Sequence, residues 1–125
     1  MRSGARELAL LTFIADRDGA TVGEAAEGFG AAHGLTRSTV LTMMERLRKK
    51  RRLMRRRVGG VFRYSSPQSR GEVLREAVES FVDRALGGSL SPFVAYLSEA
   101  TEVTDEELKE LQRVVAELQQ QRKRR

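Results

Sequence analysis

The residues best suited to chemistry form a run of cations and hydroxyl groups in the first half of the chain. Between residues 46 and 57, nine of twelve positions are lysine or arginine. Arg37, Ser38, Thr39 and Thr42 lie just before this run, and Arg46 opens it. Cations bind phosphates, while arginines and small hydroxyls contact base edges when a helix enters a major groove. These residue types therefore predict a nucleic-acid surface.

The charge of the chain is divided unevenly along its 125 residues. Residues 1–66 hold 14 lysines and arginines against 6 acidic residues, whereas residues 67–125 hold 9 against 11. A basic segment joined to a nearly neutral one indicates that the two halves have different roles and that the basic half binds a polyanion. We therefore expect a nucleic-acid-binding domain at residues 1–67 and a second domain with another role at residues 68–125.

Side chains for catalysis or metal binding are scarce. The chain has no cysteine and a single histidine, His33, which we interpret as a helix-end residue. The acids Asp105, Glu106 and Glu107 are explained by the dipole of a helix that begins there. We therefore expect no enzyme, no metal site and no cofactor. The apolar stretch at residues 9–15 is too short for a membrane span and lacks a signal-peptide cleavage site, so we expect a cytoplasmic protein.

Capping signals and periodicity predict three helices at about residues 3–17, 21–33 and 36–51. The second opens with a capping box from Thr21 to Glu24 and ends at Gly34, and the third begins at Thr36. In the third helix, Val40, Met43, Met44 and Leu47 have core spacing. This spacing turns the following residues outward: Arg37, Ser38, Thr39, Thr42 and Arg46.

After the third helix the pattern changes to that of a β-hairpin. Two short runs rich in β-branched and bulky residues, 53–58 and 61–65, flank Gly59-Gly60, a pair suited to a turn with positive φ. We interpret Phe62 and Tyr64 as core residues of this wing. Helix-turn-helix followed by a hairpin predicts a mainly α, winged helix-turn-helix fold. The basic residues expected near DNA phosphates are Lys49, Lys50, Arg55, Arg56, Arg57 and Arg63.

Three further helices are expected in the second half. A capping box at residues 69–72 opens the first, Ser91-Pro92 opens the second, and a capping box at residues 104–107 opens the last. The last helix carries Leu108, Leu111, Val115 and Leu118 at spacings of three, four and three, a short coiled-coil-like seam. The hairpin and these helices complete a winged helix followed by a C-terminal helical region.

Several segments together resemble the penicillinase repressor family of winged-helix regulators, the BlaI/MecI/CopY type. Residues 36–50 are similar to its recognition helix, and residues 60–64 are similar to its wing strand. Residues 81–94, which contain Phe81 and Gly87-Gly88-Ser89, look like the family's F-L-x-x-x-F/Y-G-G-S segment, and the acidic start of the last helix is also similar. The resemblance covers nearly the whole chain.

This resemblance implies a homodimer that represses transcription at a palindromic operator on double-stranded DNA. Residues 1–67 would be its winged-helix DNA-binding domain, and residues 68–125 its C-terminal helical dimerisation region. By position, Ser38, Thr39, Thr42 and Arg46 become the base-contact candidates. The dimer candidates, which could instead be core within one chain, are Phe93, Val94, Leu97, Leu108, Leu111 and Val115.

The resemblance also bears on how repression is released. In antibiotic-responsive members a sensor pathway ends in cleavage of the repressor, and the matching bond here is Tyr96–Leu97, where those members have Asn-Phe. A sensor protease is therefore a candidate partner. The chain lacks the cysteine cluster of the copper-responsive branch, and Arg51 replaces a glycine usual in the family.

Two other functions fit the same residues. The basic run and the tail at residues 122–125 would also suit a non-specific nucleic-acid-binding protein, although no aromatic-rich strand suited to stacking on unpaired RNA bases is found. A protein-interaction adaptor could keep the fold without binding DNA. Specific binding to a palindromic duplex separates the repressor from both.

Overall fold

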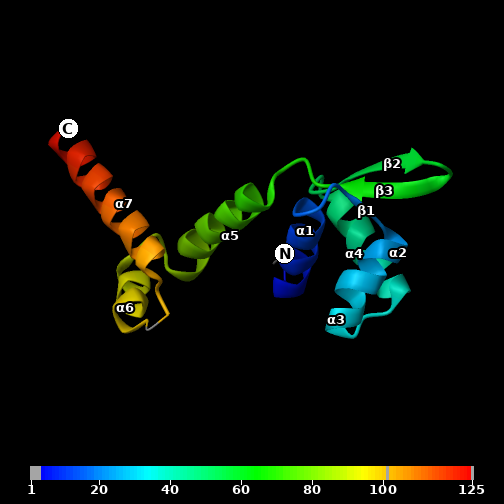
Figure 1. The fold of residues 1–125 in the computed structure, drawn as a ribbon, viewed down its shortest axis with the longest axis horizontal. Coiled ribbons are helices and arrows are strands. Elements are labelled where there is room, and N and C mark those ends of the chain that lie inside the picture. The colour runs from blue at the N-terminus through cyan, green and yellow to red at the C-terminus, as the bar shows by residue number, and fades with distance from the viewer. Residues whose placement is uncertain (1–3, 101, 125) are drawn as a thin grey trace. The chain divides into compact units, whose positions relative to one another are not determined.

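The computed structural model describes residues 4–100 and 102–124 and contains the expected winged helix followed by further helices (Figure 1). The chain divides into two compact units, residues 1–85 and 86–125. The ends of two expected features, Ser3 at the start of the first helix and Arg125 in the basic tail, lie outside the described residues.

The first unit begins with four helical segments and one very short strand. Helix α1 spans Ala5–Ala15, and strand β1 spans Ala20–Thr21. The expected second helix is one helical stretch of three parts: α2 (Val22–Ala25), a π-helical turn η1 (Ala26–Gly30) and α3 (Ala31–His33). Its capping box is confirmed, since Thr21 and Glu24 exchange backbone-to-side-chain hydrogen bonds of 3.0 and 3.1 Å. Gly34 ends the stretch at a φ of 65°, as expected for a left-handed cap.

Helix α4, Arg37–Lys49, is the third helix of the helix-turn-helix. Its N-cap is Thr36, whose side-chain oxygen accepts a hydrogen bond of 3.2 Å from the backbone N–H of Thr39. Val40, Met44 and Leu47 are buried, as their spacing predicted. The opposite face of the helix is therefore turned to solvent.

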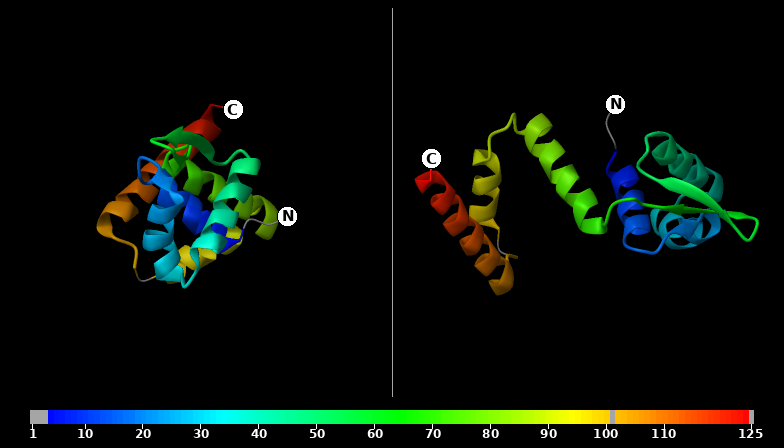
Figure 2. Two further views of the ribbon diagram at one scale, coloured as in Figure 1. Left: turned by 90° about the vertical axis from the view of Figure 1, so that its right-hand side faces the viewer. Right: turned by 90° about the horizontal axis from the view of Figure 1, so that it is seen from above.

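The wing is a hairpin of β2 (Met54–Val58) and β3 (Val61–Ser65), which extends away from the helices of the first unit (Figure 2). Gly59 and Gly60 connect the strands with φ values of 58° and 81°, which fits a tight hairpin turn. The sheet has three antiparallel strands in the order β1-β3-β2. Strand β1 was not expected, because two residues are too few to show an alternating pattern.

The core of the first unit joins the helix-turn-helix, the wing and the next helix. It is formed by Leu10, Leu11, Ile14, Ala20, Ala25, Phe29, Val40, Met44, Leu47, Leu53, Tyr64 and Val73. Tyr64 is buried as predicted for the wing, while Phe62 is half-buried. Val73 belongs to α5, Arg70–Ala85, which packs against α1. By packing, α5 thus belongs to the first unit, whereas the division of roles at residue 67 stays a prediction.

The second unit consists of α6, Ser91–Glu99, and α7, Asp105–Lys123. The capping box of α7 is confirmed by hydrogen bonds of 3.0 and 3.1 Å between Thr104 and Glu107. Within the described part of this unit no residue is buried. Two amphipathic helices without a buried core gain little from tertiary packing, so their apolar faces remain to be covered.

Candidate nucleic-acid interface

The outward face of α4 presents the residues that were predicted to contact bases. Arg37, Ser38, Thr39, Thr42 and Arg46 are all exposed. The hydroxyl of Thr42 donates to the carbonyl of Ser38 at 3.0 Å, which leaves its oxygen able to accept. The hydroxyl of Thr36 donates to that of Thr39 at 3.0 Å, which leaves the Thr39 proton able to donate. The helix therefore offers donors, acceptors and guanidinium groups on one surface.

Glu45, also on α4, connects this helix to both strands of the wing. Its carboxylate accepts hydrogen bonds from the Arg48 guanidinium at 2.8 Å, from Arg55 on β2 at 3.0 Å, and from the Tyr64 hydroxyl on β3. Arg55 and Tyr64 are direct cross-strand partners. One carboxylate thus holds a paired position of the hairpin against the helix. Glu45 has no local sequence signal, because its partners on the wing are brought to it only by the turn after α4 and by the strand register.

These contacts change the ionisation of both partners. The hydrogen bonds from Arg48 and then from Tyr64 lower the pKa of Glu45 from 4.5 to about 2. Burial, followed by the hydrogen bond to Glu45, raises the pKa of Tyr64 above its usual value of 10. At neutral pH, Glu45 is therefore a carboxylate and Tyr64 a neutral donor.

The wing carries arginines on both faces of its hairpin. Arg55 and Arg57 share a face with Phe62, and their guanidinium groups lie 4.0 and 4.8 Å from the centre of its ring. On the other face Arg56 lies directly opposite Arg63. Two like charges at opposed positions destabilise a hairpin unless a counter-charge is present. Four arginines in this small sheet therefore favour an anionic partner.

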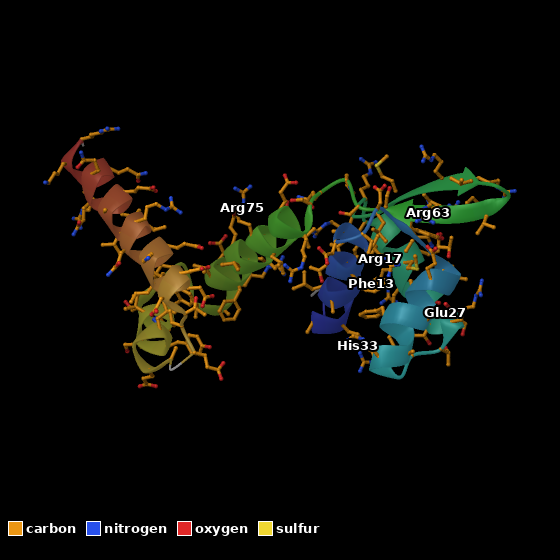
Figure 3. The ribbon with its side chains drawn as sticks, in the orientation of Figure 1. Phe13, Arg17, Glu27, His33, Arg63 and Arg75 are labelled. Atoms are coloured by element: carbon orange, nitrogen blue, oxygen red, sulfur yellow. The ribbon has the colours of Figure 1, made fainter. Side chains whose placement is uncertain are left out.

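A carboxylate within the protein neutralises part of the positive charge at Arg63. Figure 3 shows Arg63 at the side of the wing that faces α2. Its guanidinium lies 3.2 Å from the carboxylate of Glu24 and donates to the carbonyl of Gly19 at 3.3 Å. The pKa of Glu24 is lowered by the N–H of Thr21 and further by Arg63. Arg63 therefore ties the wing to the start of α2.

Lys50 and Arg52, which follow the end of α4, also pair with carboxylates on other helices. The Lys50 ammonium lies 2.9 Å from the carboxylate of Glu7 on α1, which is only 9% exposed. Arg52 pairs with Glu76 on α5 at 3.2 Å. Three predicted DNA-binding cations, Lys50, Arg55 and Arg63, thus have carboxylate partners inside the protein. The others make no ion pair within residues 4–100 and 102–124: Arg37, Arg46, Lys49, Arg56 and Arg57.

Arg51 follows α4 in a backbone conformation that is unusual for a side chain with a Cβ. Its φ is 64°, and its N–H donates to the carbonyl of Arg48 at 2.9 Å. This left-handed position is one that glycine adopts at lower cost. The structure thereby gives a physical reason for the glycine expected there from the family resemblance.

His33 lies at the end of α3, as the sequence predicted (Figure 3). Its ring stacks on Phe29 with centroids 4.2 Å apart, and Nδ1 lies 2.9 Å from the Phe29 carbonyl oxygen. No cluster of three or more histidines and acids that could hold a metal is found in the described part of the chain. Across the same residues no helix is both long and apolar enough to cross a membrane.

The residues predicted for the dimer interface lie on the uncovered faces of α6 and α7. Phe93, Val94, Leu108, Leu111 and Val115 are exposed, and Leu97 is half-buried. Beside them lies a groove of about 480 Å³ lined by Tyr96, Leu97, Ala100, Glu102, Val103, Glu107, Glu110, Leu111 and Val114. Within the second unit these six side chains form no buried core, and their assignment to a dimer interface stays a prediction.

The bond between Tyr96 and Leu97, the candidate cleavage site, lies inside α6. Tyr96 is exposed and Leu97 half-buried. A protease needs its substrate in an extended conformation, so this bond becomes accessible only when α6 opens locally.

Comparisons with known proteins agree with the geometry. The sequence profile of a family described as Penicillinase repressor matches residues 3–117. Among solved structures, a MarR family protein from Bacillus stearothermophilus is 20% identical, with a TM-score of 0.52 over 98% of this chain and 77% of its own. MepR, a transcription regulator of the Staphylococcus aureus multidrug efflux pump MepA, is 19% identical, with a TM-score of 0.53 over 91% and 78%. No curated protein sequence matches the chain.

Proposed function

The chain belongs to the penicillinase repressor family and is a DNA-binding transcription regulator, and from this premise we propose that it is a homodimeric repressor of a palindromic operator. Helix α4 would enter the major groove of each half-site, and the wing would contact the adjacent backbone. The observation that carries this proposal is the exposed face of α4, which presents the hydroxyls of Ser38, Thr39 and Thr42 together with Arg37, Arg46 and Lys49. The wing joined to α4 through Glu45 adds Arg56 and Arg57, and none of these five cations makes an ion pair within the described residues.

The residues of this surface divide into three groups by the role proposed for each. Ser38, Thr39, Thr42 and Arg46 are proposed to contact base edges, because they lie on the outward face of α4. Arg37, Lys49, Arg56 and Arg57 are proposed to bind phosphates, since they make no ion pair in the described part of the protein. Lys50, Arg55 and Arg63 are proposed to hold the helix and the wing in place through Glu7, Glu45 and Glu24.

A dimer is proposed because the second unit exposes the apolar faces of both its helices. A partner copy would cover the side chains of Phe93, Val94, Leu108, Leu111 and Val115. Two winged helices on one dimer would then read the two halves of a palindrome. Cleavage at Tyr96–Leu97 by a sensor-linked protease would release the operator, and it would first require α6 to unwind.

The experiment that tests the proposal is a titration of the purified protein with the DNA upstream of its own coding sequence and with a scrambled duplex of equal composition. We expect a short protected palindrome, two protomers per site, and a large preference for the native duplex at physiological salt. Equal affinity for both duplexes, together with competition by bulk RNA, would favour the non-specific nucleic-acid-binding alternative.

Single substitutions test whether the outward face of α4 binds the DNA. Arg46→Ala is expected to weaken specific binding by about 1–3 kcal/mol, as for an arginine on a base edge. The matched control is Arg75→Ala, which removes an exposed arginine from α5 and should leave binding unchanged (Figure 3). If Arg46→Ala and Thr42→Ala leave every DNA affinity unchanged, the adaptor alternative gains support.

A further inference from the structure

Helix α7 separates its charges by sign along its length. Residues 102–110, which lead into the helix and form its first turns, contain five carboxylates and one lysine. Residues 119–124, which end it, contain three cations and no carboxylate. Carboxylates near the N-terminus and cations near the C-terminus each interact favourably with the helix dipole. Because every described side chain of α7 is exposed, both sets are also available to another molecule.

The apolar seam of α7 has a spacing that reads the same in both directions. Leu108, Leu111, Val115 and Leu118 are separated by three, four and three residues, and all four are exposed. In an antiparallel pair of identical helices, Leu108 can lie opposite Leu118 of the other copy while Leu111 lies opposite Val115. The same register brings residues 122–124 of one copy beside residues 102–104 of the other.

The groove between α6 and α7 has the charge that suits such a partner. Its apolar lining includes Leu97, Leu111 and Val114, and its acidic lining consists of Glu102, Glu107 and Glu110. The last turns of α7 combine an apolar surface at Val115 and Leu118 with the cations of residues 122–124. The end of α7 therefore complements the groove in both polarity and charge.

We propose that two copies of this chain associate through α7 in an antiparallel orientation, with the acidic half of each helix beside the basic end of the other. This inference rests on the proposed homodimer and assigns its geometry. In a parallel pair the two acidic halves would lie together, as would the two basic ends, and like charges at short distance oppose association. The antiparallel pair buries the same apolar seam and replaces both repulsions with attractions.

Charge-reversal variants of the full chain test the orientation. The first, E102K/E106K/E110K, makes both ends of α7 basic and keeps Glu107, which caps the helix. The second, R122E/K123E/R124E, makes both ends acidic. In the antiparallel dimer each variant replaces attraction with repulsion, so we expect the dimer Kd to rise at least about tenfold at low salt. Sedimentation equilibrium measures this change.

The chain that carries all six substitutions distinguishes pairing from an effect within one helix. Its charges are exchanged end for end, so antiparallel pairing predicts that self-association returns towards the wild-type value. If the charges acted only on the helix dipole, this variant would be the least stable of the three. A parallel dimer predicts that none of the three variants raises the Kd, because the like-charge contacts at each end of the helix either persist or become weaker.

Matched controls place the same charge changes on the first unit. D16K/D18K/E27K reverses three exposed acids, and K49E/R56E/R57E reverses three exposed cations of the proposed DNA surface. Both controls are expected to remain dimeric, whereas the second should lose DNA binding. A rise in the dimer Kd for the controls as large as that for the α7 variants would overturn the proposal in favour of a general effect of net charge.

Cross-linking gives a measurement of orientation that does not depend on charge. The chain has no cysteine, so single cysteines can be introduced at Leu108 and at Leu118. Under mild oxidation a mixture of the two variants should form mixed disulfide dimers, while each variant alone should form few. Cross-linking of each variant with itself would show a parallel pair. A wild-type chain that stays monomeric would overturn the proposed homodimer as well, whereas a dimer with the wrong cross-links overturns only its orientation.

Discussion

The Tyr64 hydroxyl on β3 donates a hydrogen bond to the Glu45 carboxylate on α4, and Arg55, the cross-strand partner of Tyr64, donates to the same carboxylate. One side chain therefore joins the helix that is proposed to contact DNA bases to the wing that is proposed to contact the DNA backbone. A change at this carboxylate should affect both the stability of the first unit and the geometry of its DNA surface.

Loss of the charge at position 45 is expected to destabilise the protein. Glu45→Gln keeps the size of the side chain but weakens its charge-assisted hydrogen bonds, so we expect unfolding free energy to fall by about 2 kcal/mol. Tyr64→Phe removes one of these bonds and should cost about 1 kcal/mol. Urea denaturation measures both changes. Equal stability of the wild type and Glu45→Gln would show that the carboxylate contributes nothing to the fold.

Acid is expected to weaken the fold partly through the same group. The pKa of Glu45 is lowered from 4.5 to about 2 in the folded protein, because Arg48 and Tyr64 bind its charged form. A lowered pKa stabilises the fold above pH 4.5, and this contribution is lost as the pH falls from about 4.5 towards 2. Unfolding free energy measured across this window should fall less steeply for Glu45→Gln than for the wild type. Identical slopes would contradict the assignment.

Two adjacent lysines at the end of α4 are expected to behave differently. Lys50→Ala leaves the buried Glu7 carboxylate without its partner and should lower stability by about 1–3 kcal/mol, with little change in the salt dependence of DNA binding. Lys49→Ala removes an exposed cation and should lower the salt slope by about one while stability is unchanged. Thermal unfolding and DNA titrations at several salt concentrations check both. A reversal of the two patterns would exchange the proposed roles.

Arg51→Gly is expected to stabilise the protein. Arg51 has a φ of 64°, and glycine removes the steric cost of that conformation, so we expect a gain of up to about 1 kcal/mol after the greater freedom of glycine in the unfolded chain is counted. Arg51→Ala is the control, since it removes the same charge but keeps the Cβ. No difference in melting temperature between the two variants would show that the backbone at this position is unstrained.

Local signals determined most of the architecture. The capping boxes at Thr21 and Thr104, the Gly59-Gly60 turn and the spacing of Val40, Met44 and Leu47 each act over a few residues, so they were readable without a structure. The outward placement of Arg37, Thr42 and Arg46 followed from the same helical period. The presence of further helices after the winged helix was readable for the same reason.

Tertiary structure alone decided which charged groups meet. Glu7 and Lys50 are 43 residues apart, and Glu24 and Arg63 are 39 apart, so only the packing of α1 on α4 and of the wing on α2 brings them together. Strand β1 and the packing of α5 on α1 likewise depend on long-range contacts rather than on any local pattern. A run of cations in the sequence does not reveal which members will find an internal carboxylate. Whether a cation forms an internal ion pair depends on the distances between elements. Lys50 pairs with the carboxylate of Glu7, whereas the adjacent Lys49 makes no ion pair within the described residues.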